Sequence, residues 1–178
     1  IKDEVNIAPV PGAIQPGVSF GIMAAKALEE KKIDGFWANG MGAETAVRNG
    51  VGNVILDVRR GDAPTIAFNY TMPALITTDA LIDRDPETVA AAVRAIVKTQ
   101  NALKADVSRA TEVGERLFPP GDATVIASVV ERDLPYYTPE VSPEFVSGMN
   151  QFARDMGFLE GNPSYEQVVA TQFMDLWN

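Results

Sequence analysis

Short apolar runs alternate with helically spaced apolar positions through the first third of the chain. Residues 5–10, 33–38 and 51–58 are short apolar runs of the kind that form buried strands. Residues 19–32 and 43–48 carry apolar positions at helical spacing, and Asn49-Gly50 ends the second of these helices. The order β-α-β-α-β predicts an α/β fold in which helices pack on a parallel sheet.

The pattern changes after a polar, breaker-rich connection at residues 59–65. Two further strands are predicted at residues 66–70 and 74–78, and the rest of the chain is predicted to be helical. Asp85-Pro86-Glu87 has the residues of a helix start, with an N-cap aspartate, proline at the first helical position and an acid in the first turn. The remaining helices are predicted at residues 106–117, 122–132, 142–157 and 164–176.

Composition excludes several classes of function. Hydrophobic residues make up 46% of the 178 residues, which is enough to build a core, and the net charge of −9 makes nucleic acid an unfavourable partner. The chain has no cysteine and no histidine, so thiolate chemistry and the usual general base are absent. No apolar run approaches the length that spans a bilayer, and we expect no signal peptide in this form, because no basic segment followed by an apolar one opens the sequence. Because the chain begins at Ile1 without a methionine, we expect a processed protein or a fragment.

The most specific candidate site is a glycine-containing turn between a predicted strand and a predicted helix. Gly40-Met41-Gly42 partly matches the dinucleotide-binding fingerprint, but Thr45 replaces its third glycine. A tight strand-to-helix turn is the simpler interpretation. A third interpretation is an anion site, because free N–H groups at a helix N-terminus attract negative charge and open α/β sheets bind ligands at this edge.

Other residues are expected near the same edge. Gly12 follows the first predicted strand, and Asn39 offers both donors and an acceptor. Glu44 is either a ligand contact or an acid that stabilises the start of a helix. Arg59 has a fork that suits a carboxylate, sulfonate or phosphate, although a surface ion pair with a nearby aspartate is the favoured alternative. Tyr70 and Thr71 are expected beside the connection between the two parts of the chain.

The sequence predicts neither a metal site nor catalytic residues. Asp83, Asp85 and Glu87 alternate as in a calcium loop, but Thr88 and Arg94 stand where that loop needs glycine and glutamate. No G-x-S-x-G elbow is present, and no histidine is available to activate a serine. We therefore expect a protein that is not an enzyme and that uses no cofactor.

The order of these segments resembles the NMT1/THI5-like group of periplasmic substrate-binding proteins, which includes the sulfonate, nitrate and taurine receptors of ABC transporters. The passages that carry the resemblance run from about residue 5 to residue 175. They are Ala27-Leu28-Glu29 to Lys32-Ile33-Asp34-Gly35-Phe36-Trp37, Val54-Ile55-Leu56-Asp57, the strand at residues 73–78, Asp85-Pro86-Glu87-Thr88-Val89, and Ser142-Pro143-Glu144 to Asp155-Met156-Gly157-Phe158.

The resemblance implies a type II periplasmic-binding-protein-like fold, in which two α/β lobes close over a small solute. Residues 1–62 would form most of lobe II, and residues 63–178 would form the hinge crossing and the mainly helical C-terminal part of lobe I. The N-terminal lobe would be missing from this chain. The solute would be a small organic or inorganic anion or a small heterocycle, held in the interlobe cleft. The residues expected to bind it are Gly12, Asn39, Gly40, Met41, Glu44, Arg59, Tyr70 and Thr71.

The resemblance also implies a periplasmic or other extracytoplasmic location and a membrane permease of an ABC importer as partner. Family members that synthesise pyrimidines depend on histidine, so the absence of histidine argues against that activity here. Two alternatives stay open. One is a nucleotide-dependent α/β enzyme built on Gly40-Met41-Gly42, and the other is a non-catalytic interaction domain.

Overall fold

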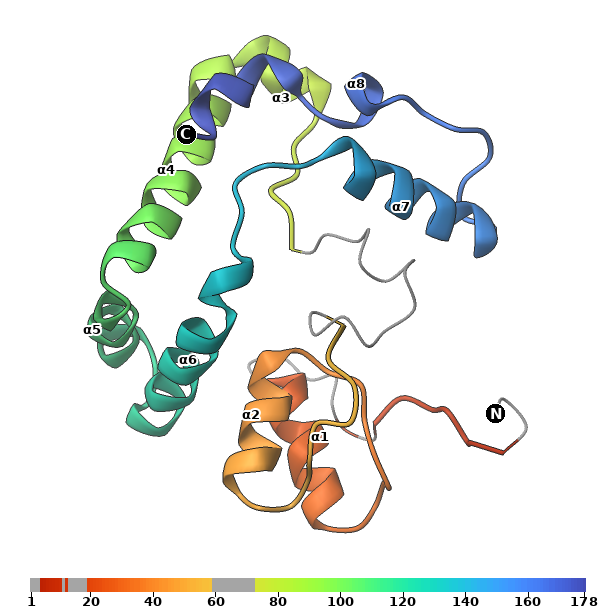
Figure 1. The fold of residues 1–178 in the computed structure, drawn as a ribbon, viewed down its shortest axis with the longest axis vertical. Coiled ribbons are helices and arrows are strands. Elements are labelled where there is room, and N and C mark those ends of the chain that lie inside the picture. Colours follow the sequence, from red (N-terminus) through yellow and green to blue (C-terminus); the bar gives the residue numbers. More distant parts are fainter. Residues whose placement is uncertain (1–3, 11, 13–18, 59–72) are drawn as a thin grey trace. The chain divides into compact units, whose positions relative to one another are not determined.

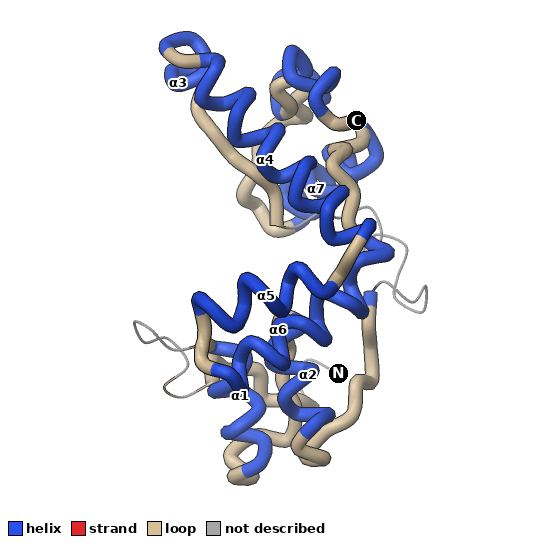
Figure 2. Tube along the Cα trace, turned by 90° about the vertical axis from the view of Figure 1, so that its left-hand side faces the viewer, coloured by secondary structure: helices blue, strands red, loops and turns tan. Residues whose placement is uncertain are grey.

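The computed structural model of the chain describes residues 4–10, 12, 19–58 and 73–178 (Figure 1). Helices make up 62% of the described part, which contains no strand (Figure 2). The α-helices are α1 (Phe20–Glu29), α2 (Gly40–Arg48), α3 (Asp79–Arg84), α4 (Pro86–Ala105), α5 (Ser108–Leu117), α6 (Pro120–Asp133), α7 (Pro143–Asp155) and α8 (Tyr165–Val168). The 3₁₀ helices η3 (Leu134–Tyr136) and η4 (Thr171–Leu176) also lie in the described part.

The predicted parallel sheet, and with it the α/β class, is wrong for the described residues. Residues 5–10, 33–38, 52–57 and 74–78 contain no regular secondary structure, and the strand predicted at residues 66–70 lies outside the described part. Apolar side chains on these segments are largely exposed, with Ile55 at 92% and Ile76 at 86%. A strand depends on hydrogen bonds and side-chain packing from a neighbouring strand. Without a neighbour in the described part, the apolar pattern of these segments yields no sheet.

The helix predictions are largely confirmed, because their starts are encoded locally. Ser19, Asn39, Asp85 and Ser142 are N-caps whose side chains accept a backbone N–H of the first turn. Helix α3 was not predicted. It is capped by Thr78, whose Oγ1 accepts from the Leu81 N–H at 3.2 Å. The helix predicted over residues 164–176 is divided into α8 and η4.

The chain divides into two compact units. The first, unit 1, comprises Ile1–Ile55 and Val107–Asp133. Within it, α1 packs on α2, α5 packs on α6, and α2 also contacts α6. Among its described residues, the buried apolar side chains are all alanines: Ala24, Ala25, Ala27, Ala46 and Ala123. Small side chains of this kind let helices approach one another closely.

Unit 2 comprises Leu56–Asp106 and Leu134–Asn178. Helix α4 packs against both α3 and η4, and α7 packs against α8. Its main core cluster is formed by Val89, Ala90 and Phe173, with partly buried apolar side chains around it. Those surrounding residues are Leu81, Ile82, Val93, Ala170 and Leu176. The cluster joins the end of the chain to the helices that begin near residue 79.

The second half of unit 2 is also fixed by polar contacts. Asn150 is buried on α7, and its Nδ2 donates to the Pro163 carbonyl at 3.0 Å. The Tyr165 hydroxyl donates to the Val141 carbonyl at 2.6 Å, and burial raises the pKa of Tyr165. These bonds tie the segments before and after α7 together.

The division into these two units does not test the predicted domain boundaries. The second stretch of unit 1, residues 107–133, returns to the first unit after α4. The assignment of residues 1–62 and 63–178 to the lobes of a binding protein stays a prediction. In the described part, no helix has both the length and the apolar character needed to cross a membrane.

Candidate anion site at the start of α2

Helix α2 begins with the predicted turn, and Asn39 is its N-cap. Asn39 is extended, with φ −70° and ψ 175°, and its Oδ1 accepts from the Gly42 N–H at 3.5 Å. The first N–H groups of an α-helix have no partner within the helix, and the helix dipole adds partial positive charge at the same end. The start of α2 is therefore electropositive although no basic residue lies in its first turn.

A second helix N-terminus lies directly against this one. A Cβ placed on Gly42 would come 2.9 Å from both the Cα and the carbonyl oxygen of Gly21. A Cβ on Gly21 would come 2.7 Å from Asn39 Oδ1 and from the Gly42 nitrogen. Gly21 lies in the first turn of α1, whose N-cap Ser19 accepts from the Ile22 N–H at 3.5 Å. The two glycines thus bring two positive helix ends into contact.

Four charged side chains form a network along α2 and the end of α6. Glu44 lies 2.9 Å from Arg48 Nε through Oε1 and 3.2 Å from Arg132 Nη1 through Oε2. The Nε of Arg132 also donates to Asp133 Oδ1 at 2.8 Å, and Arg48 donates to the Ser128 hydroxyl. Two guanidinium groups balance two carboxylates, so the network itself adds no net charge beside the helix ends.

The guanidinium of Arg132 reaches the first residue of α2. A Cβ on Gly40 would come 2.9 Å from Arg132 Nη2 and 2.9 Å from Val129 Cγ1. Any side chain at position 40 would therefore displace α6 residues from the start of α2. Glycine here keeps Arg132 close to the N-terminal turn.

The structure brings together four of the residues predicted to bind a solute: Asn39, Gly40, Met41 and Glu44 all lie on α2 or its cap. Gly12 is exposed and has a φ of +74°, a left-handed conformation that suits glycine. Arg59, Tyr70 and Thr71 lie outside the described residues.

Sequence reasoning missed the partners that come from elsewhere in the chain. Arg132 and Asp133 lie 88 and 89 positions after Glu44, and no local pattern links them. Gly21 carried a usable signal, because a glycine inside a helical pattern often marks a close packing contact.

The close packing of α1 against α2 explains why position 42 is a glycine. Gly40, Met41 and Gly42 are all helical residues of α2, and Gly42 faces the backbone of α1. The dinucleotide fingerprint places its glycines in a turn that follows a strand, and no strand precedes α2 in the described part. Gly42 is therefore explained by the packing of α1 on α2, and Gly40 by the close approach of Arg132 and Val129 of α6.

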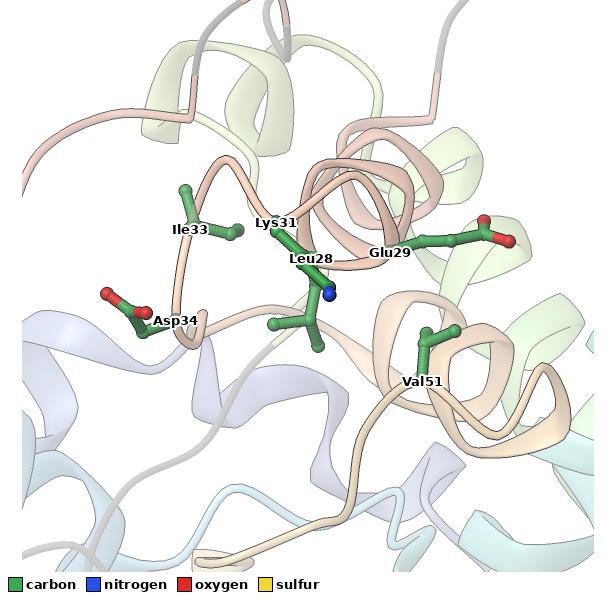
Figure 3. A pocket seen from close by; sticks show the side chains of 6 residues that line it. All are labelled: Leu28, Glu29, Lys31, Ile33, Asp34 and Val51. Carbon is green, nitrogen blue, oxygen red and sulfur yellow. The ribbon is translucent and has the colours of Figure 1, made fainter.

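A separate hollow of about 430 Å³ lies at the other end of α1 (Figure 3). Its lining residues are Leu28, Glu29, Lys31, Ile33, Asp34 and Val51. The carboxylates of Glu29 and Asp34 point apart, and the hollow is widely open to solvent. It adjoins a helix C-terminus, where the dipole favours cations, and it contains none of the predicted solute-binding residues.

Neither a metal-binding cluster in the described part nor a similar known protein adds to the description of this site. No cluster of three or more histidine, cysteine, aspartate or glutamate side chains suitable for a metal occurs among the described residues. No family model matches the sequence, and neither the curated proteins nor the solved structures give a match. The resemblance to periplasmic substrate-binding proteins therefore stays a prediction.

Proposed function

We propose that this protein binds a small anion at the adjoining N-termini of α1 and α2, as the solute-binding component of an ABC importer. The observation that carries the proposal is the backbone contact between Gly21 and Gly42, which joins two positive helix ends. The proposal does not require a sheet.

The site suits an anion because its unpaired groups are donors. The Ile22 and Gly42 N–H groups are bound by the caps, and the other backbone N–H groups at the two helix starts, with the Asn39 amide nitrogen, can donate to ligand oxygens. A carboxylate, sulfonate or inorganic oxyanion fits these donors, and a heterocycle fits through its acceptor atoms.

The expected affinity follows from the two helix ends. Each end contributes at most about 2 kcal/mol to binding a negative charge in a partly buried position. Two ends together therefore support a dissociation constant of roughly 1 mM. Tighter binding would need further contacts, such as those predicted for Arg59, Tyr70 and Thr71.

The proposed role involves no bond breaking. In this role the protein captures its solute outside the cytoplasm and delivers it to a membrane permease. No general acid, general base or cofactor is needed, in keeping with a chain that has no histidine and no cysteine.

A charge introduced at the N-cap tests the site without removing the cap. In Asn39→Asp the new carboxylate can still cap α2, because aspartate is as good an N-cap as asparagine. It also places a negative charge where the ligand would bind. The matched control is Ser142→Asp, which makes the same change in charge at the N-cap of α7.

Calorimetric titration of sulfate, methanesulfonate and acetate at constant ionic strength gives the readout. We expect the unmodified protein and Ser142→Asp to bind at least one of these anions, and Asn39→Asp to lose at least tenfold in affinity. Equal binding by Asn39→Asp and Ser142→Asp, or no binding of any anion by the unmodified protein, would exclude the site.

A further inference from the structure

An asparagine–glycine pair lies at each end of α2. Asn39-Gly40 forms the start of the helix, where Asn39 is the N-cap, and Asn49-Gly50 forms its end, where Asn49 is the C-cap. Asparagine is one of the thermolabile residues of proteins. A following glycine has no side chain, so its backbone nitrogen can approach the asparagine side chain closely. Both pairs therefore have the sequence of a deamidation site, but their surroundings differ.

Deamidation of such a pair is an intramolecular substitution followed by hydrolysis. The backbone nitrogen of the glycine attacks the side-chain amide carbon of the asparagine, its proton leaves with the departing ammonia, and a cyclic succinimide remains. Water then opens either carbonyl of the ring and gives aspartate or isoaspartate. One amide and one water thus become one acid and one ammonia, without another reactant. The reaction requires the asparagine side chain and the glycine nitrogen to leave their positions in the helix.

The pair at the start of α2 is held by tertiary packing. Asn39 Oδ1 accepts from the Gly42 N–H at 3.5 Å. A Cβ on Gly40 would come 2.9 Å from both Arg132 Nη2 and Val129 Cγ1, so side chains of α6 lie directly against the Gly40 backbone. Ring closure at Asn39 would break the cap and move Gly40 among these atoms. Because protein interiors are close-packed, we expect this packing to oppose the reaction.

The pair at the end of α2 is held by backbone hydrogen bonds of the last turn. The Asn49 N–H donates to the Thr45 carbonyl and the Gly50 N–H to the Val47 carbonyl, each at 3.0 Å. Gly50 has a φ of +68°, and no described atom lies within 4 Å of its Cβ position. Helix ends open locally at a small cost in free energy. Ring closure at Asn49 therefore needs the opening of one turn, without displacing the side chains of another helix.

We propose that Asn49 is a site of spontaneous deamidation and that the packing of α2 on α6 protects Asn39 from the same reaction. The product at residue 49 carries a negative charge at the C-terminal end of α2, where the helix dipole disfavours it. Isoaspartate also lengthens the backbone at the C-cap. The modification therefore loosens the end of α2. It lies away from the start of the helix, so the proposal does not depend on anion binding there.

Trypsin separates the two pairs, because it cleaves after Arg48. Asn39 lies in the peptide formed by residues 33–48, and Asn49 begins the next peptide. The whole protein is incubated at mildly alkaline pH, with and without urea, and mass spectrometry of the peptides follows the conversion of amide to acid. In the folded protein, Asn49 should convert at least tenfold faster than Asn39. In urea, where only the shared Asn-Gly sequence acts, the two rates should be similar.

Asn49→Gln is the matched control, because glutamine keeps the amide but disfavours the five-membered ring. This variant should remove the mass increase from the second peptide, which also distinguishes Asn49 from Asn53 in the same peptide. Equal rates at Asn39 and Asn49 in the folded protein would overturn the proposal. So would no conversion of Asn49 in the folded protein, or a mass increase that persists in Asn49→Gln. The measurement uses no ligand, so this proposal and anion binding can fail separately.

Discussion

Each of the two units of this protein is stabilised internally by a different kind of contact. Unit 1 buries alanines, brings α1 and α2 into backbone contact at Gly21 and Gly42, and links α2 to α6 through Glu44 and Arg132. Unit 2 surrounds Phe173 with the aliphatic side chains of α3 and α4. Unit 1 is thus fixed mainly by close backbone approach and ion pairs, and unit 2 mainly by apolar burial.

The difference has a consequence for function. Small residues at the contact of α1 with α2 leave no bulky side chain between the first turns of the two helices, so their N–H groups lie near one another. In unit 2 the contacts of α4 are made by larger side chains along its apolar face. Close helix packing is therefore the feature of unit 1 that the proposed anion site depends on.

The largest loss of stability is expected from a core substitution in unit 2. Phe173→Ala should lower the free energy of unfolding of unit 2 by about 3–5 kcal/mol, because it removes a buried aromatic ring from the core. Hydrogen exchange at the amides of α4 and η4 measures the loss, while the amides of α1 and α2 should be unaffected. Met174→Ala is the control, since Met174 is 40% exposed. Equal destabilisation of both units would contradict the view that each has its own core.

A smaller loss of stability is expected when a side chain is added at the contact between α1 and α2 in unit 1. Gly42→Ala places a Cβ 2.9 Å from backbone atoms of Gly21, and the overpacking should cost about 1–3 kcal/mol. Gly121→Ala is the control in the same unit, because nothing lies within 4 Å of its Cβ position, and it should be neutral or stabilising. Urea unfolding measures both. If the two variants are equally stable, α1 and α2 do not make this contact.

The ion pairs of unit 1 are expected to contribute less. Glu44→Gln removes the charge shared by Arg48 and Arg132 and should destabilise unit 1 by up to about 1 kcal/mol, since these side chains are partly solvent-exposed. The effect should shrink at high salt. Glu30→Gln is the control, because the exposed pair of Glu30 with Lys32 joins residues of one local segment. A salt-independent loss in Glu44→Gln would point to packing instead of charge.

The smallest effect is a pH dependence in unit 2. Hydrogen bonds from the Thr88 hydroxyl and the Thr88 N–H lower the pKa of Asp85 from its ordinary value of 3.8. The unfolded chain therefore binds the proton more readily than the folded one. The stabilisation from this cap is fully present above pH 3.8 and is lost as the pH falls through the lowered pKa of the folded state.

Comparison of the unmodified protein with Asp85→Asn checks this pH dependence. Asparagine still caps a helix but does not titrate, so its stability should lack the component that Asp85 contributes below pH 3.8. Thermal unfolding followed by circular dichroism gives the measurement. Parallel pH profiles for the two proteins would show that Asp85 makes no such contribution.

The sequence by itself determined most of the helices. The starts of α1, α2, α4 and α7 are encoded by a cap that acts within three residues, and proline follows that cap in α4 and α7. It also placed Asn39, Gly40, Met41 and Glu44 together, because they are neighbours on one helix. Such interactions are local and need nothing from the rest of the chain.

Tertiary structure alone decided the absence of a sheet in the described part and the surroundings of α2. An apolar run becomes a strand only when another strand supplies hydrogen bonds, and the run does not encode whether that partner is present. The pairing of Glu44 with Arg132 joins α2 to α6, and the contact of Gly21 with Gly42 joins α1 to α2. Both depend on how the helices pack, because residues distant in sequence meet only where the folded backbone brings them together.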